Sequence, residues 1–435
     1  MIITRIAPSP TGFLHLGTAR TALFNFLFAK KMAGKMYLRI EDTDRKRSQK
    51  IYEKDIITGL KWLGIKWEGD VIRQFERRKE YRRYIDRLME YGFAYKADGA
   101  IWLNVEAALT GKKLSIIEFD DLIRGKISFP GHKIKDFVIV ASNGSPLFLL
   151  TNVIDDYLMG VTHIIRGEDH ISNTPRQILL FKTLGMDLPK YAHIPLILAP
   201  DRSKMSKRAG AVSLLEYRKN GILPETLVNF LFLLGFHPKN DKEFLTLSEM
   251  AQEFDLKRVQ KAGAIFDETK LLSINSWYIR NLPKDKVLDY LKEFVKVKIS
   301  KQKFKKYFAI TRDRMERLTD FQDRVKFLEK LPDYSSELLI FKKSTLKDTK
   351  YALNLVYIRL RKAQAGAWKR EDLIKKELEQ VVAENNLSNG DVFWSARVAL
   401  SGLSASPQPS EIAWALGREE SLERIKRAIG KIIKI

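Results

Sequence analysis

Two segments far apart in the chain carry residues whose types and spacing suit phosphate chemistry. In the first, residues 7–18, prolines and Gly12 indicate a turn, and a helix is expected to begin just after His15. The start of a helix presents free N–H groups and the positive end of its dipole, so this corner suits a triphosphate. Gly17 would let a purine ring or a backbone approach closely. An ordinary strand–turn–helix corner is the alternative interpretation.

The second segment, residues 203–208, places the cations Lys204, Lys207 and Arg208 within five residues, next to an Ala-Gly pair. Cations beside small residues could close over a pyrophosphate leaving group and stabilise its charge. A solvated basic loop is the alternative, and it is the commoner outcome for such a segment considered alone.

The elements expected around the first segment alternate between strands and helices. Residues 2–7 and 36–40 are typical of buried strands, and the apolar positions between them follow helical spacing. This βαβ unit implies a parallel sheet that binds ligands at the carboxyl ends of its strands. The alternation returns with a helix at 148–156, a strand at 162–166, a helix from Thr174 to Gly185 and a strand at 193–198.

Residues 73–143 interrupt the alternation, and strands are expected there at 101–105 and 137–140. After about residue 202 the strand signals fade. Helices are then expected at 227–234, 284–295, 317–331, 346–364 and 391–435, the last broken at 406–409. We therefore predict an α/β Rossmann-type catalytic domain with a parallel sheet, split by an α+β insertion and followed by an all-α C-terminal half.

The composition favours a polyanionic partner and excludes some kinds of site. The net charge is +24, and residues 291–435 hold 31 Lys and Arg against 19 Asp and Glu, half of that charge on a third of the chain. Such a surface suits nucleic acid, although a basic solubility surface is the alternative. The absence of cysteine excludes disulfides and thiolate zinc sites. No apolar run approaches the ~20 residues of a membrane span, and no targeting peptide is evident, so we expect no membrane association and a cytoplasmic location.

The two chemical segments, with an interrupted nucleotide fold between them, resemble those of the class I aminoacyl-tRNA synthetases. Three longer stretches are similar to glutamyl-tRNA synthetases of the bacterial type: RIAPSPTGFLHLGTARTALFNFLFA from Arg5, LRIEDTD at 38–44 and NVIDDYLMGVTHIIRGEDH at 152–170. The resemblance covers nearly the whole chain. It implies a glutamate–tRNA ligase that uses ATP to activate glutamate and transfers it to the 3′-terminal ribose of tRNA-Glu, with tRNA-Gln as an open second substrate.

The resemblance also implies the residues that would hold each substrate. For glutamate, Arg5 would pair with the side-chain carboxylate, Glu41 would receive the ammonium group, and Arg166 would lie near the α-carboxylate. The full glutamate set is Arg5, Ala7, Ser9, Glu41, Asn152 and Arg166. The ATP set is His15, Gly17, Thr18, Asp169, His170, Ile197, Lys204 and Lys207. Within it, His15, Lys204 and Lys207 are the expected catalytic residues, and Mg²⁺ is expected to arrive on ATP.

The same resemblance assigns a role to each region. The catalytic domain would be residues 1–72 and 144–201, the insertion 73–143 would bind the acceptor arm, 202–290 would contact the tRNA stem, and 291–435 would bind the anticodon. Aromatic and guanidinium groups stack on splayed RNA bases, so the proposed anticodon contacts are Arg359, Arg361, Trp394 and Arg397. Core packing is the alternative for Trp394. We expect a monomer.

The sequence departs from many relatives in two places. Its insertion is short and lacks the cysteine-rich zinc knuckle that some relatives carry, and Phe148 stands where some have a tyrosine that touches the substrate. Glu41, Asp42 and Asp44 resemble a metal cluster, but adjacent carboxylates after a strand are also common in polar loops, and no protein-bound metal is predicted.

Three other kinds of protein share parts of this pattern. Glutaminyl-tRNA synthetases usually have a second histidine where this chain has Thr18, and their bacterial forms end in β-barrels. Shortened paralogues that glutamylate a modified base lack the C-terminal half. A catalytically inactive tRNA-binding paralogue is the alternative from another functional class. The intact Arg5, His15, Glu41 and the two lysines argue against it.

Overall fold

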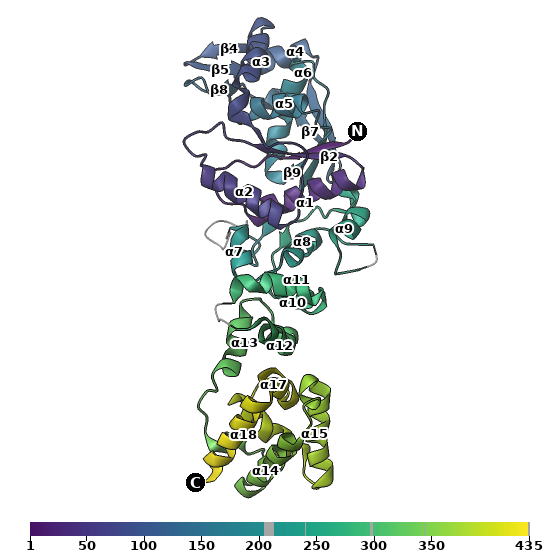
Figure 1. Ribbon diagram of the computed structural model, residues 1–435. Helices are drawn as coiled ribbons and strands as arrows, with labels where there is room; N and C mark the ends of the chain where they lie inside the picture. The colour runs from purple at the N-terminus through teal and green to yellow at the C-terminus, as the bar shows by residue number, and fades with distance from the viewer. Residues whose placement is uncertain (204–212, 240, 296–298, 343, 434–435) are drawn as a thin grey trace. The chain divides into compact units, whose positions relative to one another are not determined.

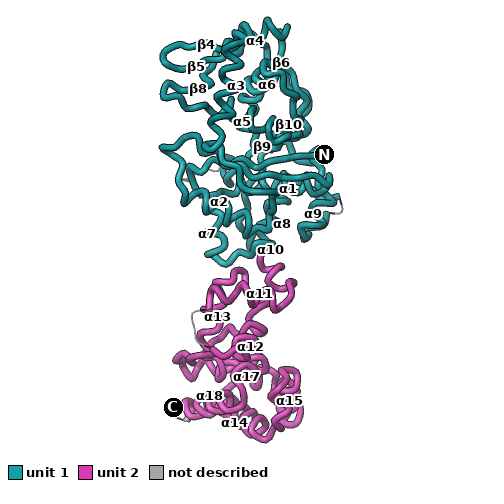
Figure 2. Tube along the Cα trace, turned by 45° about the horizontal axis from the view of Figure 1, so that its top comes forward, with its two compact units in different colours: residues 1–274 teal, residues 275–435 magenta. Residues whose placement is uncertain are grey.

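The computed structural model describes residues 1–203, 213–239, 241–295, 299–342 and 344–433. They fall into two units, Met1–Ile274 and Asn275–Ile435, drawn in different colours in Figure 2, and each is described by itself. Within the described residues, every strand belongs to the first unit. No described helix is both long and apolar enough to span a membrane.

The first unit is organised around parallel strands (Figure 1). β1 (Ile3–Ile6) pairs in parallel with β2 (Lys35–Ile40), and β2 pairs in parallel with the two-residue β3 (Ile72–Arg73) on its other side. β9 (His163–Gly167) pairs with β10 (Lys190–Ile194). The Thr162 N–H donates to the Ile3 carbonyl oxygen at 2.9 Å, which joins β1 to the start of β9. The expected strands at 2–7, 36–40 and 162–166 are thus confirmed.

The helices of the nucleotide fold cover this sheet. α1 (Leu16–Lys31) packs on β1, β2 and β9 with buried residues that include Ala19, Leu23 and Leu27, spaced as one helical face. α5 (Phe148–Leu158) and α6 (Thr174–Thr183) pack against each other, and α6 starts with proline in its first turn. The remaining helices of the unit are α2 (Lys50–Trp62), α3 (Arg78–Glu90), α4 (Val105–Gly111), α7 (Leu214–Lys219), α8 (Pro224–Leu233), α9 (Leu247–Glu253) and, across the division, α10 (Glu268–Asn281).

The region predicted as an insertion contributes to two sheets. β4 (Ala94–Ala97), β5 (Ala100–Leu103) and β8 (Phe137–Val140) form a separate antiparallel sheet. This confirms the strand expected at 137–140, whereas the strand expected at 101–105 ends at Leu103, because Asn104 caps the helix that begins at Val105. The hairpin of β6 (Ile116–Asp121) and β7 (Gly125–Pro130) instead extends the parallel sheet, because β6 pairs with β10. Alternate residues of β6 are buried, as expected for a strand with one covered face.

The expected strand at 193–198 is wrong in its bounds. β10 ends at Ile194, directly before Pro195, which has no N–H for a further ladder bond. The chain then forms the short β11 (Ile197–Leu198), which pairs with β12 (Ala264–Ile265) from the region where strand signals fade. Pro195 and Leu196 therefore connect two separate strands, where the sequence predicted one continuous strand.

In its described residues the second unit is helical and without strands, as predicted. α14 (Leu346–Lys362) packs against α15 (Glu371–Glu384) and α18 (Arg418–Ile433). The buried Arg424 side chain donates from Nη1 to the carbonyl oxygens of Phe327 and Leu400, and so satisfies acceptors near the ends of two helices. The other helices are α11 (Lys284–Leu291), α12 (Lys301–Thr311), α13 (Asp320–Glu329), α16 (Ser395–Ser401) and α17 (Pro409–Leu416).

Candidate active site

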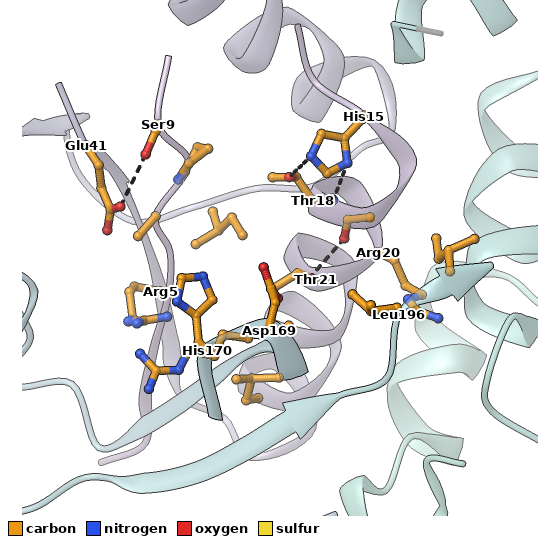
Figure 3. A pocket seen from close by; sticks show the side chains of 18 of the residues that line it. Arg5, Ser9, His15, Thr18, Arg20, Thr21, Glu41, Asp169, His170 and Leu196 are labelled. Atoms are coloured by element: carbon orange, nitrogen blue, oxygen red, sulfur yellow. Dashed lines mark hydrogen bonds between the residues drawn. The ribbon is translucent and has the colours of Figure 1, made fainter. Parts of the chain in front are cut away.

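A pocket of about 620 Å³ lies in the first unit, lined by the ends of β1, β2 and β9, the start of α1 and residues 195–197. Every described residue of the expected glutamate and ATP sets lines it. In Figure 3, Arg5, Ser9 and Glu41 lie along one side, across the pocket from His15 and Thr18. Lys204 and Lys207 lie outside the described residues. The described motif residues therefore converge on one cavity with two distinct ends.

Glu41 supplies a buried carboxylate directly after β2. Its Oε1 accepts a hydrogen bond from Asn152 Nδ2 at 2.8 Å, and its Oε2 accepts one from Ser9 Oγ at 3.4 Å. Arg39 Nη2 lies 3.6 Å from Oε1. Burial raises the pKa of Glu41 above its ordinary value, although Arg39 and Asn152 act in the opposite direction. The contacts hold this carboxylate in place, where a cationic group of a ligand would favour its ionised form.

Arg5 is fixed by a carboxylate that the sequence analysis did not single out. Its Nε and Nη2 donate to Asp156 Oδ1 and Oδ2 at 2.9 and 3.3 Å, and Arg39 Nη1 donates to the same Oδ1 at 2.6 Å. Burial raises the pKa of Asp156, but Arg39 and Arg5 outweigh it and hold that pKa below its ordinary value. Asp156 thus orients two buried guanidinium groups from adjacent strands.

The neighbouring Asp155, also in α5, binds a different set of side chains, which come from residues 74–81. Its carboxylate accepts hydrogen bonds from Gln74 Nε2 at 2.8 Å, Arg77 Nε at 2.7 Å and the Tyr81 hydroxyl at 2.8 Å. The signal in the sequence was two consecutive acidic residues within the apolar helix 148–158, where unpaired carboxylates would be costly to bury. Such a pair predicts buried cationic partners, although it does not identify them.

Arg166 is a buried cation of a different kind, because its described partners are all neutral. Its Nη1 donates to Gln177 Oε1 at 2.7 Å, its Nη2 to Thr174 Oγ1 at 2.8 Å and its Nε to His193 Nε2 at 3.2 Å. The residue is 5% exposed, and burial lowers its pKa to about 10. Among the described residues, no carboxylate lies within ion-pair distance of this guanidinium. A buried charge without a counter-ion in a pocket wall favours an anionic ligand.

The opposite end of the pocket is the start of α1. His15 is the N-cap residue, and its ring accepts the Thr18 N–H at 3.3 Å. A Cβ atom at Gly17 would lie 3.2 Å from the His15 ring, so glycine leaves the ring room at this corner. The preceding turn is held by Asp55, whose Oδ2 accepts the Leu14 N–H at 2.8 Å. The N-terminal end of a four-turn helix thus faces the cavity, as the sequence predicts.

Asp169 and His170 lie between the two ends (Figure 3). The His170 ring stacks on Phe148 at 5.3 Å between centroids, and burial, followed by the nearby Arg166, lowers its pKa to about 4. The imidazole is therefore neutral near pH 7. A Cβ atom at Gly167 would collide with the Asp169 carboxylate, so glycine is required for this carboxylate position.

The backbone at residues 195–197 is held by two residues that the sequence analysis missed. Glu168 Oε1 accepts the Leu196 N–H at 2.7 Å, and the buried Arg20 donates to the carbonyl oxygen of Pro195. Burial lowers the pKa of Arg20 to about 10, despite the opposing effect of Glu168. The backbone groups near Ile197 are fixed from both sides by these two charged side chains.

In the second unit, the proposed anticodon residues make contacts within the protein. Arg359 pairs with Glu377 at 2.6 Å and with Glu384 at 3.1 Å, and so connects α14 to α15. The exposed Arg361 lies over the Tyr357 ring at 5.7 Å. Trp394 Nε1 donates to the Leu338 carbonyl oxygen at 2.9 Å, and Arg397 Nη2 donates to Gln408 Oε1 at 3.2 Å. These contacts show packing roles, and the anticodon roles stay predictions.

No group of three or more His, Asp or Glu residues within the described ranges is arranged to hold a metal ion. Asp42, one of the three acidic residues considered for such a cluster, accepts the Phe75 N–H at 2.8 Å and lies 3.9 Å from Arg45. The Asp42 carboxylate therefore binds the backbone of the segment that follows β3.

Comparison with known proteins agrees with this architecture. The family described as tRNA synthetases class I (E and Q), catalytic domain, matches residues 1–100 and 109–273, and the anticodon binding domain family matches residues 285–429. Glutamate–tRNA ligase 2 of Thermoanaerobacter pseudethanolicus is 37% identical over 478 residues, covering 99% of this chain and 98% of the relative. The glutamate–tRNA ligase of Thermodesulfovibrio yellowstonii is 37% identical over 466 residues, covering 99% of each chain.

Solved structures give the same result for the fold. A glutamate tRNA ligase from Elizabethkingia meningosepticum, crystallised in complex with its amino acid, superposes with a TM-score of 0.85 at 29% identity and covers 99% of each chain. The glutamate–tRNA synthetase of Elizabethkingia anophelis gives a TM-score of 0.84 with the same coverage. On the catalytic and anticodon-binding matches and the full-length relatives, the chain belongs to the class I aminoacyl-tRNA synthetases for glutamate and glutamine, among the glutamate–tRNA ligases.

Proposed function

We propose that this pocket activates L-glutamate with ATP and then transfers it to tRNA-Glu. The observation that carries the proposal is Arg166, a buried cation without a described counter-ion, in the same cavity as the helix start at His15. One end of the cavity therefore favours a carboxylate, and the other favours phosphate.

The charges of the glutamate end are complementary to those of glutamate. Its two carboxylates would meet Arg166 and Arg5, and its ammonium group would meet Glu41. Arg166 would take the α-carboxylate and Arg5 the side-chain carboxylate. Because Asp156 fixes Arg5, and Asn152 and Ser9 fix Glu41, the three charges are held before the ligand binds. Such pre-organisation lowers the cost of orienting the substrate.

At the other end, ATP would place its phosphates at His15, Gly17 and Thr18 and its nucleoside near Asp169, His170 and Ile197. The glutamate α-carboxylate oxygen attacks the α-phosphorus in line, and the bond to the β-phosphate oxygen breaks, which gives glutamyl-adenylate and pyrophosphate. Lys204 and Lys207, outside the described residues, would stabilise the charge of the leaving group. Mg²⁺ would bind the phosphate oxygens of ATP and neutralise part of their charge.

In the second step, the terminal ribose hydroxyl of tRNA attacks the adenylate carbonyl, and AMP leaves. The match of residues 285–429 to an anticodon-binding family and the net charge of +24 support tRNA as the acceptor. We further propose a monomeric enzyme that acts in the cytoplasm. Charging of tRNA-Gln in addition to tRNA-Glu stays an open part of the proposal.

The test is charging of purified tRNA-Glu and tRNA-Gln with labelled glutamate and ATP. Charging of tRNA-Glu alone supports a discriminating enzyme, and charging of both supports a non-discriminating one. If neither tRNA is charged while the protein still binds tRNA, the protein is an inactive tRNA-binding paralogue and the proposal fails. The Arg166→Gln variant, assayed beside it, tests whether the buried cation is needed for glutamate binding.

A further inference from the structure

The buried Arg166 guanidinium is connected by hydrogen bonds to a residue of the β6–β7 hairpin, in the region expected to bind the acceptor arm. Arg166 Nε donates to His193 Nε2 at 3.2 Å, and His193 Nδ1 lies 2.6 Å from Asp121 Oδ2. All three side chains are buried, with Asp121 4% exposed, His193 0% and Arg166 5%. Neither Asp121 nor His193 lines the pocket.

The donor and acceptor of each hydrogen bond between Arg166, His193 and Asp121 follow from the atoms involved. An arginine Nε–H can only donate, so His193 Nε2 must accept and carry no proton. The neutral imidazole then carries its proton on Nδ1, which donates to the Asp121 carboxylate. Burial keeps the pKa of His193 below its ordinary value, although Asp121 acts in the opposite direction, and this favours the neutral ring.

Asp121 is itself fixed by the backbone on both sides. Its Oδ1 accepts the N–H groups of Ile123 and Arg124 at 3.0 and 2.9 Å, within the turn that follows β6. Its Oδ2 also accepts the His193 backbone N–H at 3.0 Å. With both oxygens engaged, the carboxylate has one orientation, and the imidazole has one tautomer.

We propose that Asp121 and His193 are positioning residues for glutamate, because together they fix the orientation of the Arg166 guanidinium that receives the α-carboxylate. The inference rests on the proposed role of Arg166. Thr174 and Gln177 hold Nη2 and Nη1, whereas the Asp121–His193 pair holds Nε, so the guanidinium plane is set by three contacts. The β6–β7 hairpin thereby becomes part of the amino-acid site, although it contributes no side chain to its surface.

Two substitutions interrupt the hydrogen bonds that link Asp121, His193 and Arg166, each at a different place. In Asp121→Asn, the amide oxygen can keep the turn N–H groups, so the amide NH₂ takes the place of Oδ2. It can no longer accept the His193 backbone N–H, and it favours a His193 proton on Nε2, where that proton opposes the Arg166 donor. His193→Asn is too short to reach Arg166, whereas His193→Gln can place an acceptor oxygen near the Nε2 position. Asp120→Asn is the matched control, because it removes the same charge from an exposed position of β6.

The experiment measures KM for glutamate, KM for ATP and kcat in tRNA charging by the full-length enzyme. Asp121→Asn and His193→Asn are expected to raise KM for glutamate by about tenfold, equivalent to about 1.4 kcal/mol, with KM for ATP within about twofold. His193→Gln is expected to raise KM for glutamate less than His193→Asn does, because its oxygen can still accept from Arg166 Nε, and Asp120→Asn is expected to behave like the parent enzyme. A merely structural role would lower kcat, through loss of folded enzyme, and leave both KM values unchanged.

The double variant Asp121→Asn/Arg166→Gln separates this inference from the proposed function. If Asp121 acts through Arg166, its substitution adds nothing to KM for glutamate once Arg166 is replaced. Additive effects, or unchanged KM for glutamate in both Asp121→Asn and His193→Asn, overturn the inference while the role of Arg166 stands. If Arg166→Gln alone leaves KM for glutamate unchanged, the proposed function of Arg166 and the positioning role both fail.

Discussion

An arginine ion pair of the first unit and one of the second unit differ in how deeply they are buried. In the first unit, Arg5 and Arg39 are 4% and 0% exposed and share one carboxylate, whereas in the second unit the Arg359 side chain is 30% exposed and joins two helices. Removing one partner of a buried ion pair leaves a desolvated charge, whereas an exposed pair is screened by water and salt. The same pairing distance therefore predicts very different energetic consequences in the two units.

The largest effect is expected for Asp156→Asn. It removes the carboxylate that Arg5 and Arg39 share, so two buried cations lose their common partner. The free energy of unfolding should fall by about 3–5 kcal/mol, and tRNA charging should be abolished. Chemical denaturation, followed by tryptophan fluorescence and circular dichroism, measures the loss.

Glu377→Gln in the second unit is the matched control, because Glu377 lies 2.6 Å from Arg359 Nε at a partly exposed position. Its substitution should cost no more than about 1 kcal/mol. Equal losses for Glu377→Gln and Asp156→Asn would show that burial does not distinguish the two units.

A second prediction concerns ligand binding rather than folding. Arg166→Gln should lower kcat/KM for glutamate by about 100-fold, since a buried charged hydrogen-bonding partner contributes about 2–5 kcal/mol to binding. The affinity for tRNA, measured by filter binding, should stay unchanged. An equal loss of tRNA affinity would mean that the substitution disturbs the whole catalytic unit rather than the glutamate end of the pocket.

The residues of the site differ in whether the sequence could predict them. Motif segments identified Arg5, Glu41 and Arg166, and the pocket brings them together because strands β1, β2 and β9 end at one edge of the sheet. Ser9 and Asn152, which contact Glu41, were in the expected glutamate set, but the partners of Arg5 and Arg166 were not predicted. Asp156 and His193 meet their arginines across sequence separations that local periodicity does not encode.

The fold shows the same limit. The alternation of strands and helices was predictable because each element buries one face of its own. The position of the β6–β7 hairpin at the edge of the parallel sheet was not, since its alternating pattern suits any half-buried strand. In the second unit, residue type alone selected Arg359 and Trp394, and type does not distinguish packing from RNA binding.

A third prediction uses salt to distinguish the pocket from the basic surface. Between 50 and 200 mM KCl, KM for tRNA should rise by at least about tenfold, because each phosphate contact releases counter-ions. KM for glutamate should change by less than about twofold, since the buried charges of the pocket are poorly screened. Parallel initial-rate measurements provide both values. A KM for tRNA that is independent of salt would contradict a role for the net charge of +24.

A fourth prediction is that stability near pH 5 depends on pH more strongly in the first unit, which contains all six histidines. Burial lowers the pKa of His163 and of His170 to about 4, so both stay neutral in the folded protein while the unfolded chain takes up protons near pH 6.5. The unfolded state then binds more protons, and the free energy of unfolding falls as the pH decreases from 6.5 towards 4. Buried Glu41, whose pKa is raised, acts in the opposite direction.

Hydrogen exchange of the full chain at pH 6.5 and pH 5, corrected for intrinsic rates, tests this difference between the units. Protection of β9 and α5 should decrease at pH 5, whereas protection of α14 and α18 should not, because residues 275–435 contain no histidine. His163→Gln removes one titrating ring that packs against Phe28 at 5.0 Å, so it should flatten the response of the first unit. An equal loss of protection in both units would assign the acid response to carboxylates, which the two units share, rather than to the buried histidines.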